Sequence, residues 1–205
     1  MSSSSEKDAE VQKFASYPLI PRPDIVIGRQ LGRGAFGSVY EGKWTIRSPI
    51  QQDEDKNEDQ EITVALKKVF MLEKEADILS KVRHRNIIQF FGVCHTNPDF
   101  FIVTEFAENG CLYEYLHEQD FQLEFDLILT WAIQIACGVQ YLHYEAPVTI
   151  IHRDLKSKNI VLGKNLVCKL CDFGTSKDMT HSCTENSWGK KEVCSLFSVL
   201  TSVYR

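Results

Sequence analysis

The stretch "GRGAFGSV", Gly32–Val39, constrains the fold of this chain more than any other feature. Its residues have the spacing G-x-G-x-x-G-x-V. In a dinucleotide-binding turn a helix follows such glycines. Here "SVYEGKW" follows, which has the alternation and β-branching of a strand. The sequence therefore predicts a hairpin over residues 25–44 and argues against an NAD-dependent oxidoreductase. An ordinary glycine-rich hairpin, or one whose backbone N–H groups cover a triphosphate, remains open.

Composition restricts the class of protein further. The chain has 205 residues, is 43% hydrophobic and 25% charged, and carries a net charge of -5, which argues against nonspecific nucleic-acid or anionic membrane partners. The polar start "MSSSSEKDAE" lacks a signal-peptide core, and we expect no membrane span. A cytoplasmic location and free thiols for the seven cysteines follow as expectations.

The order of the elements predicts an α+β protein with two unequal lobes. Strands are expected first, over residues 62–70, 86–94 and 100–106, and a long helix follows over residues 124–146. In this helix Leu127, Trp131, Ile135, Val139 and Leu142 recur at helical steps. The predicted organisation is a flexible leader (1–24), a small β-rich lobe (25–106) with a solvated polar loop (48–61), a partial, helical large lobe (107–177) and a divergent tail (178–205).

A lysine within an apolar strand is the next constraint. Lys67 lies in "VALKK", and a buried ammonium group needs an anionic partner. In the helix that follows, Leu72, Glu75, Ala76, Leu79 and Val82 share one face. Glu75 is therefore the predicted partner of Lys67. The alternative is that Lys68 faces inward and Glu75 is solvated.

Two later motifs indicate that the glycine hairpin covers a triphosphate and is not an ordinary hairpin. "IIHRDLKSKNIVL" places Asp154, Lys156 and Asn159 at H-R-D-L-K-x-x-N spacing, and "KLCDFGTSK" contains Asp172-Phe173-Gly174. Together with the glycine hairpin and Lys67, in this order, they closely resemble the protein kinase family over about Ile25 to Lys177. Lys156 follows the serine/threonine-kinase pattern.

The resemblance implies the cofactors and the site residues. Lys67, Glu75, Asp154 and Lys156 would be catalytic, with Asp154 accepting the substrate hydroxyl proton, and Asn159 and Asp172 would hold Mg²⁺. Thr104 would be the gatekeeper. Leu79, Phe90, His152 and Phe173 would stack as a regulatory spine. The residues implied to contact ATP are Leu31, Gly32, Arg33, Gly34, Ala35, Phe36, Gly37, Ser38, Val39, Ala65, Lys67, Thr104, Glu105, Ala107 and Val161.

Two longer stretches narrow the family. "MLEKEADILSKVRHRNIIQFFGV" and "YLHYEAPVTIIHRDLKSKNIVL" resemble the mixed-lineage group of MAP kinase kinase kinases, and within it the type that carries a leucine zipper and a sterile-alpha motif. The resemblance implies a protein substrate that is itself a MAP kinase kinase.

We expect the resemblance to end at Lys177, because no proline and hence no A-P-E motif follows Pro147. Two functions remain open, a serine/threonine kinase or a non-catalytic truncated form that binds nucleotide or partners and modulates the full-length kinase. In the tail, Val193, Leu196, Phe197, Leu200 and Val203 have helical spacing. This segment is either an amphipathic helix or a tail never selected for packing. We expect weak Mg-ATP binding, slow phosphoryl transfer and self-association of these 205 residues.

The cysteines and the hydroxyl side chains give weaker signals. Cys168 and Cys171 form C-x-x-C, but residues three apart on a strand face opposite sides, so neither a disulfide nor a metal site is expected. His181, Cys183 and Cys194 are too loosely spaced to indicate a metal. Candidate phosphorylation sites, which the sequence does not rank, are Thr175, Ser176, Thr180, Ser182, Thr184 and Ser187.

Overall fold

The computed structural model describes residues 17–34, 37–47, 59–69, 73–96, 98–117 and 123–179. The chain forms two compact units. The first comprises Met1–Ser80 and Phe90–Phe106, and the second comprises Lys81–Gln89 and Ala107–Arg205. The described strands lie mainly in the first unit and the longest helix lies in the second, which confirms the predicted α+β class.

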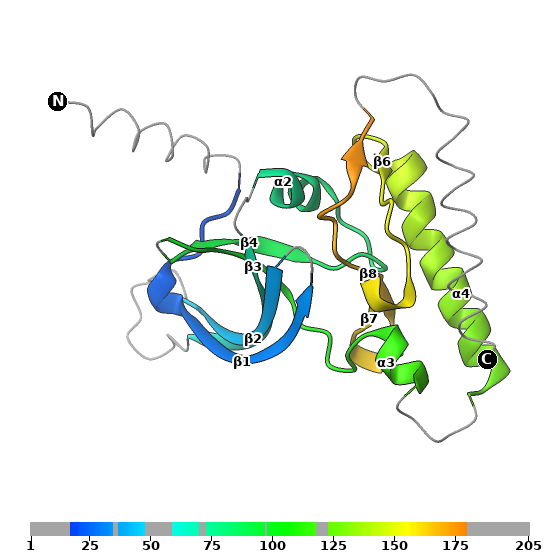
Figure 1. Cartoon of the computed structure of the whole chain (residues 1–205), viewed down its shortest axis with the longest axis horizontal. Coiled ribbons are helices and arrows are strands. Elements are labelled where there is room, and N and C mark those ends of the chain that lie inside the picture. The colour runs from blue at the N-terminus through cyan, green and yellow to red at the C-terminus, as the bar shows by residue number, and fades with distance from the viewer. Residues whose placement is uncertain are drawn as a thin grey trace, which may run out of the picture. The chain divides into compact units, whose positions relative to one another are not determined.

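The first unit is a five-stranded antiparallel sheet with one described helix beside it (Figure 1). The strand order is β1-β2-β3-β5-β4, so β1 and β4 form the two edges. The strands are β1 (Ile25–Gly34), β2 (Gly37–Ile46), β3 (Gln60–Val69), β4 (Phe90–His95) and β5 (Phe100–Glu105), and the helix is α2 (Glu73–Lys81).

The core of this unit follows from the alternation of side chains along the strands. Val64 and Leu66 of β3 are fully buried and pack in one cluster with Phe101 and Val103 of β5. Helix α2 buries the predicted face, including Ala76 and Leu79. Leu72, which was predicted on the same face, lies outside the described residues.

The second unit is built on α4 (Phe125–Gln140), which continues into one turn of π-helix, η3 (Tyr141–Glu145). Trp131, Ile135 and Leu142 are buried, as their spacing predicts, and the Trp131 indole N–H donates to the carbonyl of Leu166 at 2.9 Å. The remaining elements are α3 (Leu112–His117), β6 (Ile150–Ile151), η4 (Ser157–Asn159), β7 (Ile160–Leu162), η5 (Lys164–Leu166), β8 (Cys168–Leu170) and β9 (Lys177–Asp178). β6 pairs with β9, and β7 with β8.

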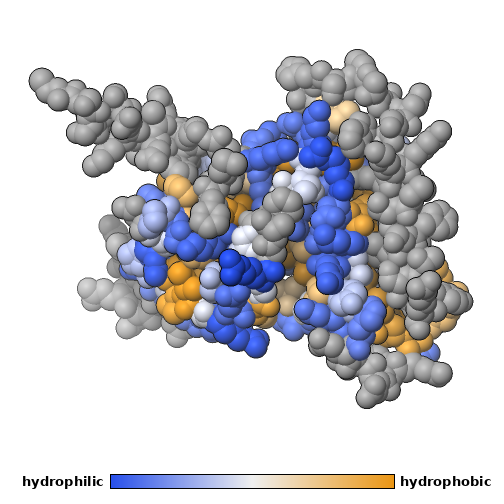
Figure 2. Space-filling model, viewed as in Figure 1, coloured by the Kyte–Doolittle hydropathy of each residue, from blue (hydrophilic) through white to orange (hydrophobic). Residues whose placement is uncertain are grey.

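One side of α4 is apolar and exposed. Phe125, Leu129 and Ile133 are 60%, 47% and 55% exposed, and Figure 2 shows hydrophobic residues near the beginning of this helix. The helical run Phe125–Glu145 is long and apolar enough to cross a membrane by length and composition alone, which leaves the expectation of no membrane span untested. A core helix meets the same criteria, so no membrane association follows from it.

The structure corrects three sequence expectations. Residues 17–24, which were predicted to be flexible, are ordered, with residues 22–24 in a 3-10 turn, η2 (Arg22–Asp24). Strand β3 begins at Gln60, inside the predicted polar loop, whose residues 48–58 lie outside the described part. Strand β4 begins at Phe90 rather than at position 86, because residues 86–88 belong to the second unit and pair with β8 within it. There the Asn86 side-chain amide donates to the Cys168 carbonyl, and the Ile88 N–H donates to the Leu170 carbonyl, both at 2.9 Å.

Candidate active site

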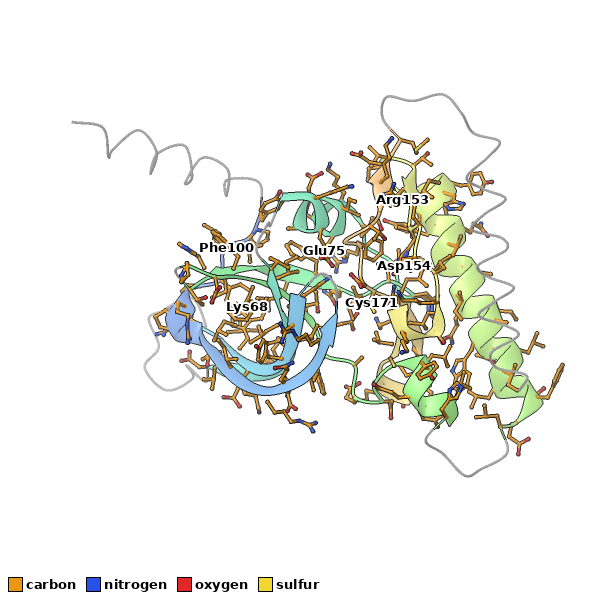
Figure 3. All side chains as sticks on the ribbon, viewed as in Figure 1. Lys68, Glu75, Phe100, Arg153, Asp154 and Cys171 are labelled. Atoms are coloured by element: carbon orange, nitrogen blue, oxygen red, sulfur yellow. The ribbon has the colours of Figure 1, made fainter. Side chains whose placement is uncertain are left out.

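The first unit contains a closely paired lysine and glutamate. Lys67 lies on β3, and its Nζ is 2.7 Å from both carboxylate oxygens of Glu75 on α2. The two side chains are 15% and 8% exposed, so the ion pair is largely removed from water. The predicted pairing is confirmed, and Figure 3 shows Glu75 on the side of α2 that faces the sheet.

The alternative pairing is excluded. Lys68 forms its own ion pair with Asp99 at 2.6 Å, and the two side chains are 31% and 28% exposed. Neighbouring residues on a strand point to opposite faces. The strand therefore places Lys67 toward α2 and Lys68 on the opposite face, where it pairs with Asp99.

The glycine hairpin has the predicted strand–turn–strand form. Gly34 lies opposite Gly37 where β1 meets β2. Gly37 has φ of +139°, and a β-carbon there would lie 2.1 Å from the Lys68 carbonyl oxygen. This glycine is therefore required by the close approach of β3. Ala35 and Phe36 lie outside the described residues.

Gly32 has a different environment. In the part of the chain that the structure describes, no atom other than those of Gly32 and its two chain neighbours lies within 4 Å of the position that a β-carbon would take at Gly32. Packing among the described residues therefore does not explain a glycine here. Open space beside an unobstructed backbone suits the close approach of a ligand such as a phosphate group.

The other nucleotide-site candidates of the first unit share its sheet. Val39 lies opposite Lys67, and Ala65 lies opposite Thr104. The Thr104 hydroxyl donates to the Glu105 carbonyl at 3.3 Å. Leu31, Gly32, Arg33 and Ser38 belong to the β1–β2 hairpin. Ala107 and Val161 belong to the second unit.

The second unit brings the residues of the H-R-D-L-K-x-x-N motif together. One carboxylate oxygen of Asp154 accepts a hydrogen bond from Lys156 Nζ at 2.6 Å and one from Asn159 Nδ2 at 2.8 Å. The same Asn159 nitrogen also donates to the Asp154 main-chain carbonyl at 2.8 Å. Asn159 is buried and the Asp154 side chain is 30% exposed. The carboxylate is thus held in place while part of it remains accessible.

The backbone around this group has unusual conformations. Arg153 and Asp172 have φ of 67° and 62°, a region that non-glycine residues seldom occupy. Such conformations cost free energy and cluster at functional sites. The residues that directly precede Arg153 and Asp172 are held in place. His152 is fully buried, and its Nε2 lies 3.0 Å from the Cys171 carbonyl oxygen. Arg153, Asp154 and Cys171 are labelled in Figure 3.

Half of the predicted spine is observed. The rings of His152 and Phe173 are 4.9 Å apart, and both residues are fully buried. Leu79 and Phe90 belong to the first unit, so a stack of all four residues stays a prediction.

Asn159 and Asp172 have the chemistry expected of magnesium ligands. Among the described residues, no three histidine, cysteine, aspartate or glutamate side chains form a metal-binding group. Mg²⁺ differs from zinc in this respect, because it is bound through one or two protein oxygens and otherwise by water and substrate phosphates. Asn159 directs its amide nitrogen to Asp154, which turns its amide oxygen elsewhere. The residues therefore fit Mg²⁺.

The structure shows the state of the five described cysteines. Cys94, Cys111, Cys137, Cys168 and Cys171 are not in disulfides, as expected; Cys183, Cys194 and His181 lie outside the described residues. Burial raises the pKa of the Cys168 thiol to about 12.

Ser176, one of the candidate phosphorylation sites, is fully buried, and its hydroxyl donates to the His152 carbonyl at 3.1 Å. It is therefore poorly accessible to a modifying enzyme. The Thr175 hydroxyl donates to the same carbonyl at 3.2 Å. Short polar residues are common in loops, so the sequence does not predict that these two hydroxyl groups bond to the His152 carbonyl. The remaining four candidates, from position 180 onward, lie outside the described residues.

The combination of a Lys–Glu pair, a glycine hairpin, a fixed aspartate and an Asp-Phe-Gly motif defines a class of protein. A sequence profile for protein tyrosine and serine/threonine kinases matches residues 25–197. The chain therefore belongs to this kinase family. The match continues past Lys177, so the expected end of the resemblance was placed too early.

Relatives among known proteins narrow the class. The chain is 55% identical over 197 residues to the mitogen-activated protein kinase kinase kinase zak-1 of Caenorhabditis elegans, with 92% of this chain covered. It is 40% identical over 159 residues to the probable serine/threonine-protein kinase SIS8 of Arabidopsis thaliana, and 36% over 159 residues to the tyrosine-protein kinase Src64B of Drosophila melanogaster, with 78% and 77% of this chain covered. The resemblance to MAP kinase kinase kinases is confirmed. The chain spans 25%, 15% and 27% of these three relatives.

Proposed function

We propose that this chain is the nucleotide-binding and catalytic part of an ATP-dependent serine/threonine protein kinase of the MAP kinase kinase kinase type. The reaction is transfer of the ATP γ-phosphoryl group to a protein hydroxyl. The observation that carries the proposal is the Asp154 carboxylate, held at 2.6 Å by Lys156 and at 2.8 Å by Asn159. A fixed, accessible carboxylate of this kind can orient a hydroxyl and accept its proton.

The other residues act by binding and by placing charge. Phosphoryl transfer depends mainly on positioning and on offsetting negative charge. Lys67, fixed by Glu75, would contact the α- and β-phosphates, and the backbone of the β1–β2 hairpin would cover them. Lys156 would offset charge near the transferred group. Asn159 and Asp172 would hold Mg²⁺, which when bound would neutralise phosphate charge.

The choice of serine/threonine over tyrosine depends on Lys156. The relatives include both kinds of kinase, so family membership does not separate them. Lys156 lies two residues after Asp154 and bonds to its carboxylate, which is the serine/threonine pattern that the motif resembles. We therefore propose a serine or threonine acceptor, in a MAP kinase kinase as the name of the nematode relative suggests.

A test of the proposed reaction identifies the modified amino acid. Residues 1–205 are incubated with γ-radiolabelled ATP, Mg²⁺ and either a basic protein substrate or a Glu-Tyr polymer, and the products are hydrolysed to phosphoamino acids. Phosphoserine or phosphothreonine in the protein substrate supports the proposal. Label confined to phosphotyrosine would contradict the assigned role of Lys156.

Cys171 gives a second test, of the nucleotide site itself. It directly precedes Asp172 and, by the resemblance, borders the nucleotide pocket. We expect an electrophile attached to an ATP-site ligand to label Cys171 faster than the other cysteines. Burial raises the thiol pKa of Cys94, Cys111 and Cys168, and a smaller thiolate fraction slows their reaction.

Competition mass spectrometry measures this labelling. Excess Mg-ATP should protect Cys171, whereas the exposed Cys137 should label at the same rate with or without ATP. Labelling of Cys171 that ATP does not change would place this thiol outside the pocket.

The cellular setting and partners are inferred from the sequence alone. We propose a cytoplasmic protein without nucleic-acid or membrane partners. Self-association stays a prediction, motivated by the exposed side of α4, and sedimentation velocity over a concentration series checks it. Nothing observed favours the non-catalytic modulator over the kinase, because the fixed Asp154 is retained.

A further inference from the structure

Residues Tyr17–Ile20, the N-terminal strap, precede the part of the chain that matches the kinase family and yet are built into its first unit. The strap lies parallel to β4, with Leu19 opposite Val93. The Ile20 N–H donates to the Val93 carbonyl, and the Val93 N–H donates to the Pro18 carbonyl, both at 2.9 Å. β4 is an edge of the five-stranded sheet. The strap therefore pairs with an edge that would otherwise be open.

The strap is anchored by a buried side chain. Ile20 is 5% exposed and belongs to the same core cluster as Leu66 and Val103, whereas Leu19 is 57% exposed. Just after the strap, Asp24 is paired with Arg47 at 2.7 Å. The segment is thus held by hydrogen bonds, by core packing and by an ion pair beyond its end.

The seat of the strap depends on Gly92. This residue has φ of +158°, and a β-carbon there would lie 2.4 Å from the Pro18 carbonyl oxygen. A β-carbon does not approach a carbonyl oxygen this closely in real structures, so any side chain at position 92 would push the strap away from β4. Glycine at position 92 has a packing reason that the family motifs do not supply.

The strap also extends the row of residues that holds the catalytic lysine. Residues that lie opposite one another on neighbouring strands form one row across the sheet. From the strap through β4, β5 and β3 to β2, this row consists of Leu19, Val93, Ile102, Lys67 and Val39. Beneath this row, Ile20 shares the core cluster with Leu66, the residue before Lys67. Hydrogen bonds and a packed core thus connect the strap to the strand that positions Lys67.

We propose that the β4 edge is a strand-docking site for residues 17–20, and that occupation of this site strengthens nucleotide binding by fixing the sheet row that contains Lys67. Removal of the strap leaves one face of the core uncovered at Ile20 and one sheet edge unpaired. Both changes loosen β4, β5 and β3 together, because these strands share the cluster. The second half of this proposal rests on the proposed nucleotide-binding function.

The experiment uses the full chain and two variants that displace the strap by different routes. Gly92→Ala obstructs its seat and Ile20→Ala removes its anchor, while Leu19→Ala, at an exposed position of the same strap, is the matched control. Hydrogen exchange of the Ile20 and Val93 amides reports the seating, and a fluorescent ATP analogue with Mg²⁺ reports binding. Circular dichroism verifies that each variant is folded.

In both displacing variants we expect the two amides to exchange roughly tenfold faster or more, since a displaced strap exposes them. We also expect the nucleotide dissociation constant to rise about threefold or more, within the range of coupling through a packed network. Leu19→Ala should change neither. Should Gly92→Ala not fold, Ile20→Ala decides the question.

Three results would overturn the proposal at different points. Fast exchange of the Ile20 and Val93 amides in the unchanged chain would show that the strap is not seated. Fast exchange in folded variants whose nucleotide affinity is unchanged would show a seat without coupling. If the unchanged chain binds no nucleotide while both amides are protected, the proposed function and the coupling fail and the docking site stands.

Discussion

Replacing Lys67 with methionine is expected to weaken Mg-ATP binding at least tenfold and to lower the free energy of unfolding by about 3–5 kcal/mol. The reason is the buried pair with Glu75, at 2.7 Å from both carboxylate oxygens. Methionine has a similar length but no charge, so it would leave the Glu75 carboxylate buried without a cation. Binding of a fluorescent ATP analogue and urea denaturation measure the two effects.

The neighbouring residue provides a matched control. Lys68→Met makes the same chemical change one position further along β3, in an ion pair with Asp99 that is partly exposed. Such pairs contribute about 0–1 kcal/mol, so both readouts should change little. If Lys67→Met and Lys68→Met behave alike, the role assigned to the Lys67–Glu75 pair is wrong.

The second large effect is expected at Asp154. The Asp154→Asn variant should transfer the γ-phosphoryl group roughly 10²–10⁴-fold more slowly, because the amide cannot accept the hydroxyl proton. Nucleotide affinity should stay within about threefold, since the carboxylate is assigned to the hydroxyl and not to ATP. Initial rates with radiolabelled ATP and equilibrium binding measure the two quantities separately.

Asp126→Asn serves as the control for this change, because Asp126 lies in the first turn of α4, away from the catalytic motif in sequence. It should leave the transfer rate unaltered. An Asp154→Asn variant that keeps the full rate would contradict the assignment of Asp154 as the base.

Much of the site was predictable because its residues are set by short-range patterns. The 3.6-residue period of α2 places Glu75 on the buried face, and the two-residue period of β3 separates Lys67 from Lys68. The contact of Lys67 with Glu75 follows from these two periods. The hydrogen bonds of Asp154 with Lys156 and Asn159 arise within one short loop, so their motif spacing was sufficient.

Features that depend on distant partners were not predictable. The prolines near the strap indicate a linker by local propensity, but Pro18 and Ile20 pair with Val93, far away in sequence. Residues 82–89 follow α2 directly, yet they belong to the second unit because Asn86 bonds to Cys168. Local hydrophobic periodicity predicts neither of these two pairings.

The sequence also does not show why each glycine of the hairpin is required. Gly37 fits the phosphate-loop motif, but its close approach to the Lys68 carbonyl requires glycine whether or not a ligand binds. Gly32 has no such constraint within the described structure. The motif therefore combines a residue required by the fold with a residue that fits a ligand, and sequence spacing alone does not separate the two.

The most direct test of the central claim is the initial rate of γ-phosphoryl transfer by purified residues 1–205, with Mg²⁺ and a serine/threonine protein substrate. The rate is measured beside Lys67→Met and Asp154→Asn, after circular dichroism has verified that all three proteins are folded. We expect a slow rate for the unchanged chain that is at least tenfold above that of either variant. Equal rates for the three folded proteins would contradict the assignment of this chain as a catalytic kinase unit.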